Sequence, residues 1–412
     1  MEVGYQRRAF AGFSIQSLQK AFILLLNFGK IIILARLLSP NDFGLFSLVT
    51  IALGTTESLT QTGVNTTIVQ SKKSINYFLD TAWVIAIIRG FIIGLIMTAL
   101  AFVMSRFYQN PQLLPLVAVA ALIPVIKGFI NPAIAKWQKQ FQFVNEGLYH
   151  GLHLLVEVVA QVLLALAWHS VWALVLGVVI GAVFEVILSF LMNQERPRLA
   201  YYTSRAKVIF KNSKWLSSAS LMAYLNDNAD DFIIGKLVGT QNLGIYHNAY
   251  SLSHKTNYEL SKSAHYSLMP VFNRINRQRE ANRLKKAVSK SLISTTILSI
   301  LASLPIFIWP ETMVKLILGE QWLLASDILG ALTLAGIIHG IANTCYAFLI
   351  ATKRYQFMNL HLFLSLILMI GGILWLTPNY GLLGASWAIA LSRLITLPIA
   401  LWGVISHFKK RT

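Results

Sequence analysis

The sequence predicts an all-α integral membrane protein with about twelve transmembrane helices in two six-helix lobes around a central cavity. Of its 412 residues, 56% are hydrophobic and only 12% are charged, which excludes an ordinary soluble chain. Apolar windows of roughly 20 residues, the length that crosses about 30 Å of hydrocarbon as a helix, recur from one end of the sequence to the other. Basic residues gather in the short connections between these windows.

Each apolar window is bounded by polar or basic residues, and this alternation sets the expected spans in chain order. They cover residues 12–36, 43–64, 82–104, 113–134, 147–167, 171–192, 215–238, 243–267, 291–309, 324–350, 356–376 and 382–405. The connections between them are short. The sequence therefore predicts a chain that lies almost entirely within the membrane, with no separate soluble domain.

The net charge of +19 would suggest a nucleic-acid partner in a soluble protein, but its placement along the chain favours a different reading. Twenty-four Lys and Arg residues fall in the segments on the side of the N-terminus, whereas only Arg106 and Lys315 fall in the opposite connections. Lys and Arg hold loops on the cytoplasmic side of a membrane. We therefore expect both termini in the cytoplasm, a multi-pass protein of a bacterial cell (inner) membrane, and no nucleic-acid partner.

The two halves of the chain share a weak internal repeat. The segment ARLLSPNDFGLF at 35–46 aligns with GKLVGTQNLGIY at 235–246, an offset of 200 residues. The segment QFVN at 142–145 likewise aligns with QFMN at 356–359. These matches predict an N-terminal six-helix lobe at 1–200 and a C-terminal six-helix lobe at 201–412, related by an axis along the membrane normal with a cavity at their interface.

Familiar catalytic signatures are missing from the sequence. It contains no GxxxxGK[ST] phosphate loop, no GxSxG elbow and no HExxH pair. The single cysteine, Cys345, excludes an internal disulfide and a cysteine-cluster metal site. We therefore expect no catalytic residues, no metal site and no cofactor apart from H⁺ or Na⁺ as a coupling ion. The energy for any work would come from a gradient or from downhill flow.

Charged side chains at membrane depth are the candidate functional residues, because a charge costs at least about 2.5–3.5 kcal/mol there and should face a cavity or a partner. The candidates for substrate binding are mostly cations: Lys30, Arg89, Lys255, Lys262, Arg393 and Tyr258. The candidates for binding a coupling ion are acidic: Glu57, Asp227, Asp230 and Glu259.

Structural roles compete with these functional ones. Lys255 and Glu259 are spaced i, i+4 on one helix and could simply neutralise each other. Glu157 and Glu185 could be protonated packing residues, and a lone histidine such as His339 is more often a packing residue than a proton relay.

Several segments resemble a known family. ARLLSPNDFGLFSLV at 35–49 and DDFIIGKLVGTQNLGIYHNAY at 230–250 are similar to paired signatures of the polysaccharide transporter family. MPVFNRI at 269–275 and LGEQWLLASDIL at 318–329 also resemble this family, and the four segments occur in the expected order. The family belongs to the multidrug/oligosaccharidyl-lipid/polysaccharide (MOP) superfamily, so the resemblance implies two six-helix lobes that alternate access to a polar cavity.

The resemblance further implies an O-antigen or teichuronic-acid type flippase. Such a protein moves undecaprenyl-pyrophosphate-linked oligosaccharide across the bacterial cytoplasmic membrane, with membrane lipid, a glycan polymerase and chain-length proteins as partners. The alternative is an H⁺- or Na⁺-coupled exporter of drugs or small molecules with the same architecture. A membrane-embedded glycan polymerase or acyltransferase is a third class, which the short external loops disfavour.

Overall fold

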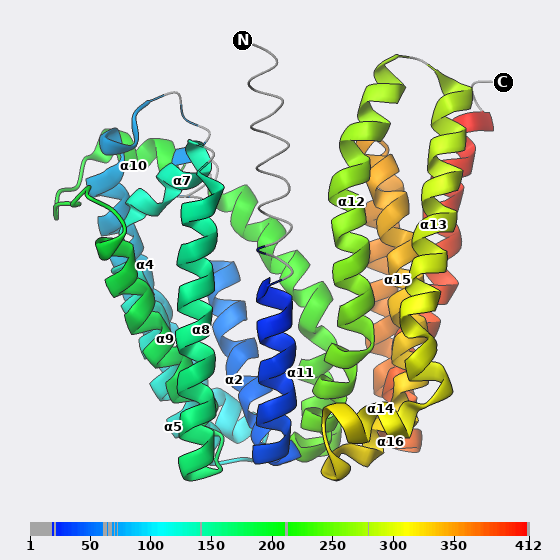
Figure 1. Cartoon of the computed structure of the whole chain (residues 1–412), viewed down its shortest axis with the longest axis horizontal. Coiled ribbons are helices and arrows are strands. Elements are labelled where there is room, and N and C mark those ends of the chain that lie inside the picture. The colour runs from blue at the N-terminus through cyan, green and yellow to red at the C-terminus, as the bar shows by residue number, and fades with distance from the viewer. Residues whose placement is uncertain are drawn as a thin grey trace. The chain divides into compact units, whose positions relative to one another are not determined.

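The computed structural model of the chain is built from helices throughout the part that it describes (Figure 1). That part comprises residues 19, 22–60, 64, 68–69, 71, 73–140, 142–210, 213–278 and 280–409. The first helix covers residues 22–37. The following α-helices are α2 (Pro40–Leu59), α4 (Leu79–Phe107), α5 (Leu113–Ala120), α6 (Leu122–Gly128), α7 (Ala135–Lys139), α8 (Phe143–Trp168), α9 (Trp172–Leu191), α10 (Thr203–Phe210), α11 (Ser213–Leu252), α12 (His254–Arg277), α13 (Ala281–Ile308), α14 (Pro310–Ile317), α15 (Ser326–Ala351) and α16 (Tyr355–Lys409). Short 3₁₀ turns cover Ile75–Tyr77, Pro132–Ile134 and Glu320–Ala325.

Six of the described helical segments are long and apolar enough to cross a membrane. They are α4, α8, α9, α13, α16 and the segment Glu320–Ala351 that contains α15. The pair Leu113–Gly128 and Pro132–Lys139, which is bent by 65°, adds a seventh if it counts as one span. The all-α membrane architecture is confirmed, while the total of twelve spans stays a prediction.

Two glycines mark boundaries between expected spans. α11 runs through Gly239 with φ +81°, and α16 runs through Gly381 with φ +58°. A residue with a Cβ atom pays steric strain at such angles, whereas glycine does not. The sequence places these two positions between the spans 215–238 and 243–267 and between 356–376 and 382–405, so the breaks lie where the hydropathy pattern expects them.

The start of α2 corresponds to one of these breaks in the internal repeat. Ser39 caps α2 by accepting a hydrogen bond from the backbone N–H of Asp42, whose side chain in turn accepts from the backbone of Ser39. At the offset of 200 residues, Ser39 aligns with Gly239. The two repeats thus interrupt their helices at equivalent positions by different means, a capping box in one and a glycine in the other.

The chain divides into two compact units, Met1–Asp227 and Asn228–Thr412. This division reflects which residues pack together and does not test the internal repeat. The two repeat-related lobes at 1–200 and 201–412 therefore stay a prediction. Within the N-terminal unit, α8 packs along α9 and α4 packs on α5 and α6. Within the C-terminal unit, α15 is the central helix and contacts α12, α13 and α16.

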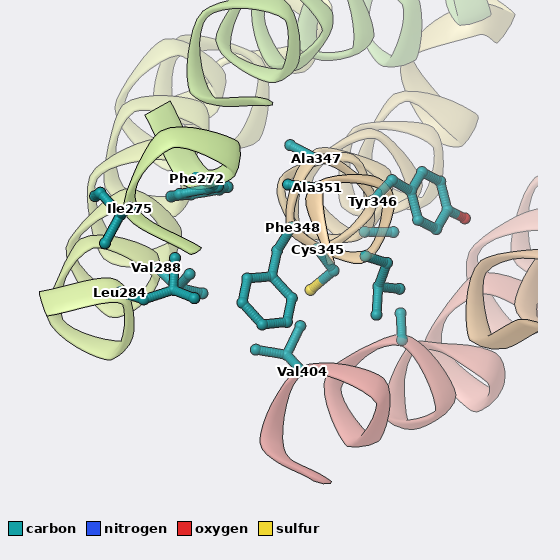
Figure 2. Packing of buried hydrophobic residues seen from close by; sticks show 13 residues of the cluster. Phe272, Ile275, Leu284, Val288, Cys345, Tyr346, Ala347, Phe348, Ala351 and Val404 are labelled. Atoms are coloured by element: carbon teal, nitrogen blue, oxygen red, sulfur yellow. The ribbon is translucent and has the colours of Figure 1, made fainter. Parts of the chain in front are cut away.

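A cluster of buried hydrophobic side chains joins these four helices near one end (Figure 2). Phe348 of α15 lies among Phe272 of α12, Leu284 of α13 and Val404 of α16, and Phe348 is fully buried. This cluster packs α12 and α13 against α15 near the C-terminal end of α12.

Candidate functional site

A network of charged residues ties four helices together in the N-terminal unit. Nζ of Lys30, on the helix at 22–37, lies 3.4 Å from Oε1 of Glu157 on α8, and the two side chains are only 18% and 14% exposed. Nζ of Lys127 on α6 lies 3.6 Å from Oε2 of Glu185 on α9. Each lysine is therefore within ion-pair reach of a carboxylate on another helix.

His153 lies between the two carboxylates of this network. Its Nε2 atom is 3.9 Å from Oε2 of Glu157, one turn further along α8, and 3.6 Å from Oε2 of Glu185. The hydroxyl of the buried Tyr149 donates to Oε1 of Glu185 over 3.4 Å. The imidazole thus connects two ion pairs that would otherwise be separate.

Small residues on α9 make this network possible. A Cβ atom added at Gly181 would lie 2.9 Å from the Cβ of Glu157, and one added at Gly177 would lie 2.2 Å from Cγ of Gln161. The Gly177/Gly181 pair is a GxxxG motif, which lets two membrane helices approach closely. The close approach of α8 and α9 brings one carboxylate oxygen each of Glu157 and Glu185 near Nε2 of His153.

A second cluster surrounds Arg393 in the C-terminal unit. The Arg393 guanidinium, on the second segment of α16, contacts Nε2 of His254 at the start of α12, and both residues are buried. The His254 ring is followed by those of Tyr258 and His339, with centroids 4.9 Å apart between the latter two. Lys262 lies over the Tyr258 ring at 5.3 Å. Arg393, Tyr258 and Lys262, three of the predicted substrate-binding residues, therefore belong to one cluster.

The contact between Arg393 and His254 determines where the imidazole hydrogen lies. A guanidinium has only N–H donors, so Nε2 of His254 must accept, and Nδ1 then carries the hydrogen. Nδ1 of His254 is buried and has no hydrogen-bond partner among the described residues. An N–H donor without an acceptor therefore lies beside a buried guanidinium, an arrangement that favours a negatively charged ligand.

The two adjacent aspartates of α11 have different partners. The Tyr246 hydroxyl donates to Oδ2 of Asp230 over 2.5 Å, and both side chains are buried. Oδ2 of Asp231 lies 2.8 Å from Nδ1 of His247. Asp230 occupies the position that aligns with Lys30 at the repeat offset of 200, so both repeats place an ionisable group at this point of the helix.

The remaining predicted residues are dispersed. Arg89 of α4 donates to the backbone carbonyl of Glu57 over 2.9 Å and to the hydroxyl of Thr60 over 3.3 Å. Asp227 of α11 is exposed. The side chains of Lys255 and Glu259 lie outside the described part of the chain, so their expected pairing on α12 stays a prediction.

The structure gives Lys30 and Lys127 acidic neighbours from other helices. Glu157 and Glu185, considered as protonated packing residues, each lie within ion-pair distance of a lysine. His153 was not among the predicted site residues, although its i, i+4 spacing to Glu157 was a readable signal. Within the part of the chain that the structure describes, no group of three His, Cys, Asp or Glu side chains is arranged to hold a metal ion.

Comparisons with known proteins agree on fold and family. The chain is 21% identical over 351 residues to the lipopolysaccharide biosynthesis protein WzxC of Escherichia coli, covering 85% of this chain and 71% of WzxC. Its fold is similar to that of the lipid II flippase MurJ in an inward closed conformation, with a TM-score of 0.73, 14% identity and coverage of 96% and 89% of the two chains.

An inward-facing multidrug resistance transporter of the MATE family, in the MOP superfamily, matches with a TM-score of 0.67, 13% identity and coverage of 94% and 96%. The chain therefore has the fold of MOP superfamily transporters and is a multi-pass membrane protein. The model of the family described as "Polysaccharide biosynthesis protein" matches residues 33–327, so the chain belongs to that family.

Proposed function

We propose that this protein is a flippase for undecaprenyl-pyrophosphate-linked oligosaccharide. It moves these units from the inner to the outer leaflet of the bacterial cytoplasmic membrane for surface polysaccharide biosynthesis, by alternating access and without catalysis. Family membership and the similarity to WzxC support the glycan pathway, and the MurJ-like fold supports a lipid-linked substrate. The observation that carries the proposal is the buried Arg393 beside Nδ1–H of His254, a donor for which the described part of the chain offers no acceptor.

The chemistry of the substrate explains why such a cluster is useful. A pyrophosphate-linked sugar is doubly anionic and heavily hydroxylated, so it cannot cross hydrocarbon without a polar path. The Arg393 guanidinium offers a planar set of donors that suits phosphate oxygens. Lys262 adds a second cation one turn along α12 from Tyr258, whose ring can stack against a sugar. A cationic drug would instead be repelled by this cluster.

The topology follows from the charge distribution. Both termini lie in the cytoplasm, because the connections on their side carry nearly all of the loop Lys and Arg residues. Newly flipped units would then be delivered to a glycan polymerase and its chain-length partners on the outer face. This arrangement predicts that loss of the protein leaves substrate on the cytoplasmic side.

Deleting the gene in its native host tests the proposal directly. Surface polysaccharide and lipid-linked oligosaccharide in the cytoplasmic leaflet are measured in the same culture. We expect the first to fall and the second to accumulate, with both restored by the intact gene. Unchanged surface polysaccharide in a strain without a redundant flippase would overturn the proposal, and drug sensitivity alone would favour the small-molecule exporter.

Complementation with point variants tests the site. Arg393→Gln removes the buried charge while keeping polarity, and we expect export to fall about tenfold or more, since a hydrogen bond to a charged group contributes about 1.5–3 kcal/mol. Lys285→Gln, which removes an exposed cation from α13, is the matched control and should export normally. Full export by the Arg393 variant at equal protein abundance would show that the cluster does not bind substrate.

A further inference from the structure

We propose that His153, Glu157 and Glu185 form a proton-binding site inside the N-terminal unit, and that proton binding loosens the ion pair between Lys30 and Glu157. The inference rests on the proposed function, because it identifies the ion that would drive the transport cycle. It concerns residues other than the acidic candidates of the sequence, Glu57, Asp227, Asp230 and Glu259. The site joins the helix at 22–37 to α6, α8 and α9.

Nε2 of His153 lies near two carboxylate oxygens, one from Glu157 and one from Glu185. Its Nε2 atom lies 3.6 Å from Glu185 and 3.9 Å from Glu157, both longer than a direct hydrogen bond. A small rotation of the imidazole would bring either carboxylate within bonding distance. The ring is therefore placed to bind a proton and to share it with one carboxylate or the other.

An unsatisfied buried atom points to the same place. Oε2 of Glu185 is buried and makes no hydrogen bond to any residue that the structure describes, although Nε2 of His153 and Nζ of Lys127 both lie 3.6 Å away. The whole residue is only 8% exposed. A buried carboxylate oxygen without a donor is unfavourable, and an N–H on His153 would satisfy it.

The charge balance of this network shows what proton binding would change. The positive charges of Lys30 and Lys127 offset the negative charges of Glu157 and Glu185, so the four groups are formally neutral together. A proton taken from water adds to the free ring nitrogen of His153 and makes the network positive. The titratable and charged groups that surround the imidazole are contributed by four helices: Lys30, Lys127, Tyr149, His150, Glu157 and Glu185.

Protonation has a structural consequence through Glu157. Its carboxylate joins α8 to the helix at 22–37 through Lys30. Glu157 presents Oε1 to Lys30 and Oε2 to His153. An imidazolium that turns toward Oε2 and bonds it would share the negative charge of this carboxylate with Lys30, and so would weaken the attraction that maintains the 3.4 Å contact. Histidine changes charge between about pH 5 and 8, so a proton gradient would bias how firmly the first helix is held.

Distance measurements between spin labels test the proposal without any glycan substrate. In a Cys345→Ala background, labels are placed at Leu25 on the first helix and Leu163 on α8, both exposed. Pulsed electron paramagnetic resonance is recorded on the purified full chain in nanodiscs between about pH 5 and 8. We expect the ratio of loosened to docked populations to change about tenfold over this range.

Three variants connect this response to the site. His153→Gln should abolish the pH dependence, whereas Glu157→Gln, which cannot pair with Lys30, should give the loosened distribution at every pH. His169→Asn is the matched control, since His169 directly follows α8, is exposed and is not among the groups around His153, and it should retain the full response. If His153→Gln does not fold, Glu185→Gln serves as the second test and should reduce the response.

Three outcomes would overturn the proposal. They are a wild-type distribution that does not change with pH, a pH response that survives in His153→Gln, and a response to Na⁺ at constant pH that the variants leave intact. The proposed function can fail separately. If gene deletion leaves surface polysaccharide unchanged while the purified protein shows the expected pH response, the flippase alone is refuted. If gene deletion abolishes export while the purified protein shows no pH response, the proton site alone is refuted.

Discussion

Removing the hydroxyl of Tyr246 is expected to destabilise the protein by about 1–3 kcal/mol, the cost of leaving a buried polar group without its hydrogen-bond partner. The hydroxyl lies 2.5 Å from Oδ2 of Asp230. Tyr246 is 0% exposed and Asp230 is 3% exposed, so water cannot replace the lost donor. Tyr246→Phe keeps the ring and leaves almost no cavity, which means that the hydrogen bond is the main quantity that changes. The expected loss corresponds to about a 5- to 150-fold decrease in the folding equilibrium constant.

The assay is equilibrium unfolding of the purified protein in mixed micelles with increasing denaturing detergent, followed by circular dichroism. Tyr380→Phe is the matched control, because Tyr380 is 65% exposed and its hydroxyl removal should change stability by less than about 0.5 kcal/mol. If Tyr246→Phe is as stable as this control, the buried hydrogen bond does not contribute to folding. The reasoning about Asp230 as a buried, partnered carboxyl would then be wrong.

Two further predictions concern helix packing and pH. Gly90→Ala should destabilise the N-terminal unit by about 1–3 kcal/mol in the same assay, because the added Cβ would lie 2.4 Å from the backbone oxygen of Pro124. Gly29→Ala, with nothing within 4 Å of the new atom, should be neutral or stabilising, and equal effects at both glycines would contradict this account. The hydrogen bond from Lys136 holds the pKa of Glu195 below its ordinary value of 4.5. The wild-type protein should therefore be more stable than Glu195→Gln at neutral pH, and this difference should disappear as the pH falls below about 4.5 through the lower folded-state pKa. Unfolding measurements on both proteins at a series of pH values would reveal it. A stability difference that persists unchanged at low pH would exclude this ion pair as its cause.

Much of the fold could be predicted from the sequence because its causes are local. A span needs only enough consecutive apolar residues, and the observed α4, α8, α9, α13 and α15 overlap the expected spans. The breaks at Gly239 and Gly381 occur where polar residues separate two apolar windows. The segments that resemble the family also occur in the expected order along the chain, and the match of the family model over residues 33–327 confirms the resemblance.

The partners of the charged residues were decided only by the tertiary structure. Lys30 reaches Glu157 across 127 residues of sequence, and Arg393 reaches His254 across 139. Helical periodicity tells which residues share a face, but it does not tell which other helix that face meets or how deep each charge lies. The close approach of α8 and α9 at Gly177 and Gly181 sets those relations in the N-terminal unit. The sequence by itself therefore determined a membrane transporter with charges at membrane depth. Only helix packing decided which charges neutralise each other, because an ion pair depends on distances of a few ångströms between segments far apart in the chain.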